Sequence, residues 1–106
     1  MFIATDQQIA DWKAKYGRIF ALPITDKDGI VYQAYFRMAD RKAISAATLS
    51  ASQPIGMDPI IFGESLLDST WLDGDAEIKT RDDLFLVVTK TLGELIPAAS
   101  GKLQEL

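Results

Sequence analysis

The chain has 106 residues, 48% of them hydrophobic, and a formal net charge of −4 at pH 7. This is the length of one domain, predicted to span residues 1–106, and the apolar fraction is sufficient for a buried core. The acidic balance and the lack of a cationic run disfavour nucleic acid as a partner. The chain has no cysteine and no histidine, which excludes disulfides, zinc sites of the usual Cys/His type and the commonest general base.

The hydrophobic residues are dispersed along the chain. No apolar run reaches the roughly 18 residues that a membrane-spanning helix needs. The first residues also lack the cationic and apolar regions of a secretory signal. We therefore expect a soluble, cytoplasmic protein without a membrane partner.

The first predicted element is a helix within residues 1–16. Thr5 or Asp6 can cap it, because a threonine hydroxyl or an aspartate carboxylate accepts a hydrogen bond from a free N–H group of the first turn. Its apolar residues recur at helical spacing on one face, which comprises Ile9, Trp12 and Tyr16. Gly17 follows at the position where a left-handed residue commonly ends a helix.

Residues 18–38 predict one β-hairpin. Two segments rich in β-branched and aromatic residues flank a turn that contains Asp28 and Gly29, and an Asp-Gly pair is a strong hairpin signal. Pro23 cannot donate a backbone hydrogen bond, so its strand is expected at a sheet edge or near the strand end. An isolated two-stranded ribbon is only marginally stable in water, and we expect it to pack on helices or to pair with another chain.

Residues 40–96 predict three or four helices that pack as a small bundle against the hairpin, so the expected fold class is α+β. The first of these helices begins after Asp40 and the second after Asp58, because aspartate is a favoured N-cap residue. Residues 50–56 between them predict a mobile loop. Residues 97–106 predict a weakly ordered tail, since a proline opens them.

The last two helices contain the densest apolar sequence. Gly63 lowers the helix propensity of the first, and a glycine there could allow another backbone to come close. An acidic loop at residues 73–75 is predicted to end this helix. The last helix is predicted to begin at Thr80, with Asp83 completing a capping box. Its apolar stripe comprises Leu84, Phe85, Val88, Leu92, Leu95 and Ile96.

Five residues are candidates for a partner-binding surface: Trp71, Leu86, Val87, Arg37 and Arg41. Leu86 and Val87 lie off the apolar stripe, and a helix with apolar residues on more than one side lies deep in a core or contacts another molecule. Trp71 is either a core residue or an interface anchor. Arg37 and Arg41 are either surface arginines, with ion pairs inside the chain, or ligands for a carboxylate of a partner.

The acidic loop resembles the start of a calcium-binding loop at Asp73, Asp75 and Glu77. Ile78 and Leu84 stand where that loop needs glycine and a bidentate glutamate, so we interpret the three carboxylates as solvated turn and cap residues. The serines have no histidine to activate them. We therefore predict no metal, no cofactor and no catalytic residue; a small enzyme would need an acid/base pair that the sequence does not place.

Two sequence blocks carry a family resemblance. They are AYFRMADRKAISAA, residues 34–47, and FGESLLDSTWLDGDAEIKTRDDLFLVVTKTLGELI, residues 62–96. With these blocks, the chain resembles tail assembly chaperone-like proteins of long-tailed bacteriophages and prophages over roughly residues 16–96.

The resemblance implies a non-enzymatic adaptor in the bacterial host cytoplasm. Such chaperones bind the helical tape-measure protein, keep it soluble and recruit tail-tube subunits. The alternative is a structural tail-completion or head–tail joining protein that stays in the particle. The sequence leaves open which tail protein is bound and whether the chain forms a homo-oligomer.

Overall fold

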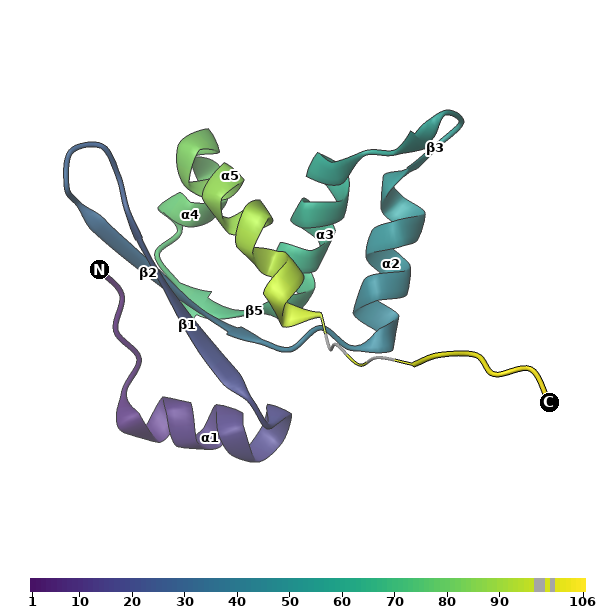
Figure 1. Cartoon of the computed structure of the whole chain (residues 1–106). Helices are drawn as coiled ribbons and strands as arrows, with labels where there is room; N and C mark the ends of the chain where they lie inside the picture. The colour runs from purple at the N-terminus through teal and green to yellow at the C-terminus, as the bar shows by residue number, and fades with distance from the viewer. Residues whose placement is uncertain (97–98, 100) are drawn as a thin grey trace.

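The computed structural model describes residues 1–96, 99 and 101–106. The predicted α+β class is confirmed, with five α-helices, a 3-10 helix and two antiparallel sheets in this described part (Figure 1). The elements are α1 (Asp6–Tyr16), β1 (Ile19–Thr25), β2 (Val31–Arg37), α2 (Arg41–Ala51), β3 (Ser52–Gln53), β4 (Gly56–Met57), α3 (Pro59–Thr70), β5 (Trp71–Gly74), α4 (Glu77–Thr80), α5 (Asp82–Thr91) and the 3-10 helix η1 (Leu92–Leu95).

Helix α1 begins and ends as the sequence predicts. The Thr5 hydroxyl accepts a hydrogen bond from the Gln8 N–H at 3.1 Å, and the Gln8 side chain accepts one from the Thr5 N–H at 2.9 Å. These two bonds form a complete capping box, which satisfies two backbone donors of the first turn. Gly17 ends the helix with a φ of 83°, a conformation that favours glycine.

The main sheet has three antiparallel strands in the order β1-β2-β5. The predicted hairpin forms β1 and β2, and Pro23 lies on β1, an edge strand. The third strand corrects our prediction, because residues 73–75 were expected to be a loop that ends a helix. Gly74 instead pairs with Ala34, and a Cβ added to Gly74 would lie 2.6 Å from the Ala34 Cα. This glycine is required for the close approach of two strands.

Helices cover both faces of the sheet (Figure 1). On the face toward α3 and α5, Phe20 and Leu22 of β1 lie beside the buried Phe36 and Ala34 of β2. Together with Ile24 these residues pack in the main core. On the other face, the ring of Trp12 from α1 packs against Tyr35 with a centroid distance of 5.6 Å. Successive side chains of β2 point to opposite faces of the sheet, so this strand contacts the main core on one face and α1 on the other.

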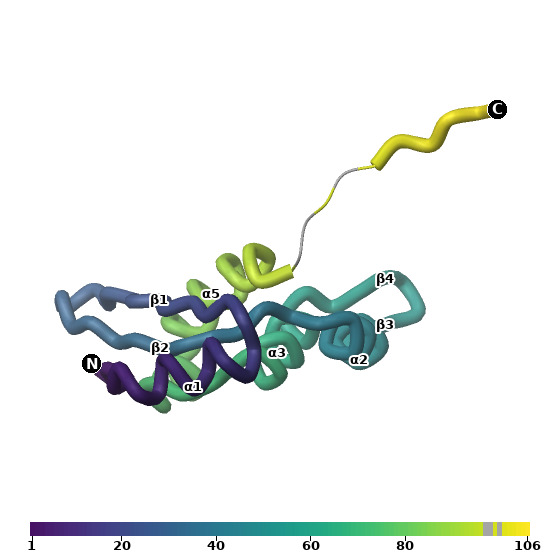
Figure 2. Tube along the Cα trace, turned by 90° about the horizontal axis from the view of Figure 1, so that it is seen from below, coloured from purple at the N-terminus to yellow at the C-terminus, as the bar shows by residue number. Residues whose placement is uncertain are grey.

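The segment between α2 and α3 corrects a second prediction. Residues 50–56, expected to be a mobile loop, form the end of α2 and part of a small hairpin in which β3 pairs with β4. This hairpin lies at the opposite end of the molecule from the β1–β2 turn (Figure 2). Helix α2 buries three small residues at four-residue spacing against its neighbours, namely Ala43, Ala47 and Ala51.

The helix predicted to begin at Thr80 begins at Asp82 instead and consists of α5 followed by η1. Thr80 is the last residue of the short helix α4, which was not predicted, and Arg81 separates α4 from α5. The expected capping box at Thr80 and Asp83 is wrong: the Thr80 hydroxyl donates to the Ala76 carbonyl, and the Asp83 carboxylate binds Arg81 instead. The predicted apolar stripe is confirmed, since Leu84, Val88, Leu92 and Leu95 are buried in the core. Phe85 and Ile96 are partly buried and pack against it. Of the predicted tail, residues 97, 98 and 100 lie outside the described residues, and residues 99 and 101–106 form no helix or strand.

Candidate functional site: a groove between α3 and α5

An open groove with a volume of about 510 Å³ lies between α3 and the α4–α5 segment. Its lining combines apolar and charged side chains: Ile60, Glu64, Leu67 and Asp68 of α3, Lys79 of α4, and Asp82, Phe85 and Leu86 of α5. We call these eight residues the α3–α5 groove. Apolar and charged side chains therefore line the same concave surface.

Local sequence explains how α3 contributes to this groove. The Asp58 carboxylate caps the helix by accepting the Ile60 N–H at 2.9 Å. The α3 residues of the groove are then spaced by four, three and one, which places them on one side of a helix. Gly63 faces α5, where an added Cβ would lie 2.6 Å from the Cγ2 of Thr89. The close approach that we expected for this glycine is thus made by α5.

The floor of the groove is apolar and partly exposed. Leu67 is buried, whereas Ile60 and Leu86 are 44% and 45% exposed. Phe85 is half-buried and packs on the core. Val87 is 42% exposed on the same helix but does not line the groove. Apolar surface is therefore available on both helices that border the groove.

The rim of the groove is acidic. The carboxylates of Glu64, Asp68 and Asp82 belong to exposed residues. Lys79 supplies the cation of the lining, and its Nζ lies 3.9 Å from Asp68 Oδ1 and 4.5 Å from the ring centroid of Trp71. Three carboxylates and one ammonium give the lining a net charge of −2.

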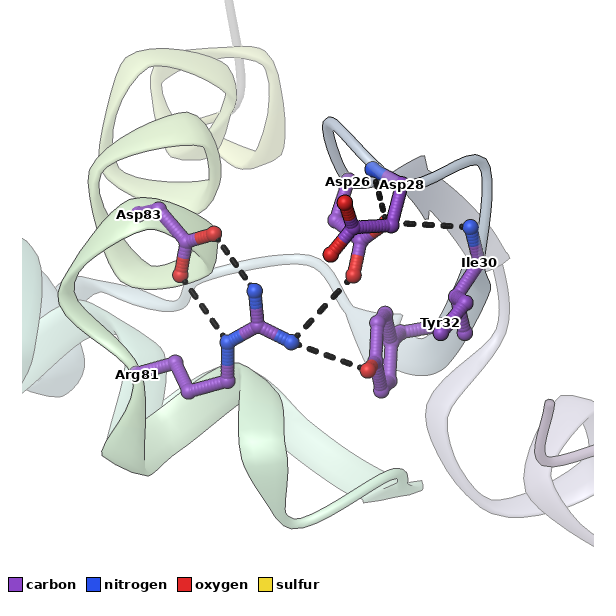
Figure 3. Close-up of polar contacts among 6 residues, drawn as sticks. All are labelled: Asp26, Asp28, Ile30, Tyr32, Arg81 and Asp83. Carbon is purple, nitrogen blue, oxygen red and sulfur yellow. Dashed lines mark hydrogen bonds and ion pairs between the residues drawn. The ribbon is translucent and has the colours of Figure 1, made fainter.

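Arg81 fixes the start of α5 to the β1–β2 turn (Figure 3). Its Nη1 donates to Asp26 Oδ2 at 3.3 Å and to the Tyr32 hydroxyl at 2.9 Å. Its Nε and Nη2 donate to the two oxygens of Asp83 at 3.1 and 2.7 Å. One guanidinium thereby joins segments 55 residues apart in sequence and sets the position of α5 beside the groove.

The same cluster keeps its carboxylates ionised. The hydrogen bonds from Arg81 lower the pKa of Asp83 although partial burial opposes them. Burial would raise the pKa of Asp26, whose side chain is 2% exposed, but N–H groups of Ile30 and Asp28 and the Arg81 guanidinium together hold that pKa below its usual value. Both acids are therefore anions at neutral pH, held in a structural role.

Another carboxylate, that of Asp75, attaches the N-terminal segment to the sheet. Its Oδ2 accepts the N–H groups of Phe2 and Gln33, each at 2.8 Å. Burial would raise the pKa of Asp75, but these two hydrogen bonds and the N-terminal ammonium lower it below its usual value. Our interpretation of Asp75 as a solvated turn residue is wrong, because its partners come from distant parts of the chain.

The five residues predicted for partner binding lie in different places. Leu86 lines the groove, and Trp71, which packs edge-to-face on Phe36 at 5.8 Å, adjoins it through Lys79. Val87 lies on α5 outside the groove.

The two candidate arginines are not groove residues. Arg37 donates to the Ser69 carbonyl at 3.1 Å and covers the ring of Tyr16, so it is engaged inside the chain. Arg41 is exposed at the start of α2.

Sequence reasoning did not identify the acidic rim or Ile60 as site residues. The signal that could have found them is the pair Glu64 and Asp68, which are four residues apart and hence on one side of α3. Their position opposite α5 depends on tertiary packing, which cannot be predicted from local sequence patterns.

Comparison of the chain with protein-family models, curated proteins and solved structures found no match. Across the described ranges, no three acidic side chains are grouped so that they could hold a metal ion. Every helix in the described part of the chain is too short or too polar to cross a lipid bilayer.

Proposed function

We propose that this protein is a tail assembly chaperone-like adaptor of a bacteriophage or prophage. It binds a long helical tail protein, in the first instance the tape-measure protein, and makes or breaks no covalent bond. The observation that supports this proposal is the groove, which exposes apolar side chains on two neighbouring helices. An amphipathic helix in a hydrophobic groove is a recurring mode of peptide recognition.

The exposed apolar surface gives an estimate of what such binding contributes. Complete burial of a leucine or isoleucine side chain stabilises a complex by roughly 1.5–3 kcal/mol. Ile60 and Leu86 retain almost half of their exposure, so covering each contributes on the order of 1 kcal/mol. These two residues alone do not produce tight binding, and a client must also contact the flanking helices.

Co-expression with the tape-measure protein of the same genome tests the proposal. We expect the tape-measure protein to become more soluble and to elute together with this chain in size-exclusion chromatography. Co-expression with a tail-tube subunit alone tests whether the chain also binds this second tail protein. Absence of a complex, with client solubility unchanged, would contradict the proposal.

Mass spectrometry of purified particles separates the chaperone from a structural component. A chaperone acts during assembly, and we expect its peptides to be absent from finished virions. Stoichiometric retention of this chain in the particles would instead identify a tail-completion or head–tail joining protein.

A further inference from the structure

We infer that the α3–α5 groove receives a partner helix whose apolar stripe is flanked by lysine or arginine. This inference rests on the proposed function, since it specifies which surface binds the helical client and which chemistry that client carries. It follows from three features of the groove: its size, its apolar floor and the sign of its rim.

The size and floor of the groove suit the side chains of a helix. Its volume of about 510 Å³ lies within the roughly 300–1,000 Å³ typical of pockets for small molecules, so it can receive several side chains of a partner helix rather than the whole helix. Leu67 and Phe85 form its inner part, and Leu86 extends the apolar surface outward. Apolar residues three or four positions apart on a client helix would therefore enter from one side and cover this floor.

The rim decides which helices fit. Glu64, Asp68 and Asp82 give the groove an excess of negative charge after the contribution of Lys79 is counted. Cations beside the apolar stripe of a client would meet these carboxylates, whereas anions there would be repelled.

The sign of the rim also disfavours a second copy of the chain. The exposed apolar residues of α5 are preceded by Asp82 and Asp83, so the same helix of another copy would bring carboxylates toward carboxylates. The chain as a whole is acidic as well, with a net charge of −4. A basic partner helix is thus the occupant that the charges select.

Two synthetic peptides provide the probes. Each has about 16 residues, or roughly 24 Å of helix, with leucine at alternating three- and four-residue spacing. One carries lysine beside the leucine stripe and the other carries glutamate at the same positions. We expect the lysine peptide to bind about tenfold more tightly in calorimetric titrations at low salt, and the preference to shrink as salt screens the rim.

A pair of variants locates the binding surface. Leu86→Lys places a charge in the groove, while Val87→Lys places the same charge on the adjacent residue, which is equally exposed but outside the groove. A third peptide, with the same leucine stripe and uncharged flanks, serves as the probe for these variants, and we expect Leu86→Lys to weaken its binding by about tenfold. We expect Val87→Lys to change it by less than about twofold. Circular dichroism and thermal unfolding verify that both variants fold.

The charge of the rim is tested separately. In the Glu64→Lys, Asp82→Lys double variant, we expect the preference for the lysine peptide to fall by about fivefold, since exposed ion pairs contribute modestly. Equal binding of the lysine and glutamate peptides by the unmodified chain would overturn the basic chemistry of the occupant. Equal losses in Leu86→Lys and Val87→Lys would overturn the groove as the binding surface. Self-association that only Leu86→Lys abolishes would identify a second copy as the occupant and also overturn the inference.

The two levels of the proposal fail differently. If the tape-measure complex forms and Leu86→Lys leaves it intact, the groove assignment is wrong and the chaperone function stands. If the lysine peptide binds as expected and the tape-measure protein does not, the groove assignment stands and the tail function is wrong.

Discussion

Replacing Gly63 by alanine tests how closely α3 packs on α5 at the side of the groove. In an exposed helix interior this substitution stabilises a protein by about 1 kcal/mol, because alanine has the higher helix propensity. Here the new Cβ would lie 2.6 Å from the Cγ2 and 3.0 Å from the Cβ of Thr89. Carbon atoms in normal contact are about 3.5–4.0 Å apart, so the Thr89 side chain or the two helices must shift by up to roughly 1 Å.

The balance of these effects is destabilising. Overpacking costs about 1–3 kcal/mol, which exceeds or cancels the gain in propensity. We expect Gly63→Ala to lower the free energy of unfolding by about 1 kcal/mol, or the melting temperature by about 4–8 °C. Urea unfolding followed by circular dichroism measures this change directly.

Thr89→Ser supplies the matched background. It removes the Cγ2 atom that meets the new methyl group and keeps the hydroxyl, which donates to the Leu86 carbonyl at 2.9 Å. We expect Gly63→Ala to be about 1 kcal/mol less harmful in this background, a coupling that a double-mutant cycle resolves. A stabilised Gly63→Ala protein, or the same effect in both backgrounds, would refute the close packing of the two helices.

Further predictions concern the distant contacts and the core. Asp75→Asn should speed hydrogen exchange of the Phe2 N–H. Because folding lowers the pKa of Asp75, the contribution of this carboxylate to the free energy of unfolding is present above about pH 4 and is lost as the pH falls through the folded-state pKa. The stability difference between the variant and the unmodified chain in urea unfolding should therefore shrink from pH 7 to pH 3. Arg81→Gln should raise the pKa of Asp26 toward its usual value, which an NMR carboxyl titration measures. Val88→Ala should cost about 2 kcal/mol in urea unfolding, since Val88 is fully buried.

Features that depend on local sequence could be predicted. The α1 boundaries followed from Thr5 and Gly17, and the α5 stripe followed from apolar residues at helical spacing. Each signal lies within a few residues of the structure that it specifies. The same holds for Asp58, whose carboxylate caps α3.

Strand β5 was not predictable in the same way. It has four residues, and two of them are Asp73 and Gly74, which are typical of turns. It becomes a strand because β2 supplies hydrogen-bond partners from residues 34–36. Pairing across that sequence separation leaves no periodic signal in so short a segment.

The candidate site shows the same division. Leu86 was recognisable because it is apolar and lies off the buried stripe of its helix. The acidic rim was not recognisable, because Glu64 and Asp82 belong to different helices and line the same groove only as a result of tertiary packing. Among the arginines, the sequence analysis named Arg37 and Arg41 as candidates, whereas Arg81 joins the hairpin turn to α5 through partners 49 and 55 residues away.

Site-directed photo-crosslinking in the cell tests whether the tape-measure protein binds in the α3–α5 groove. A benzophenone amino acid replaces Leu86 in the groove or, as a comparison, the exposed Ala46 on α2, and the chain is co-expressed with the tape-measure protein. We expect a crosslinked complex from position 86 and little from position 46. Crosslinks from position 46 alone, or from neither position while both chains are soluble and folded, would show that the groove does not bind the tape-measure protein.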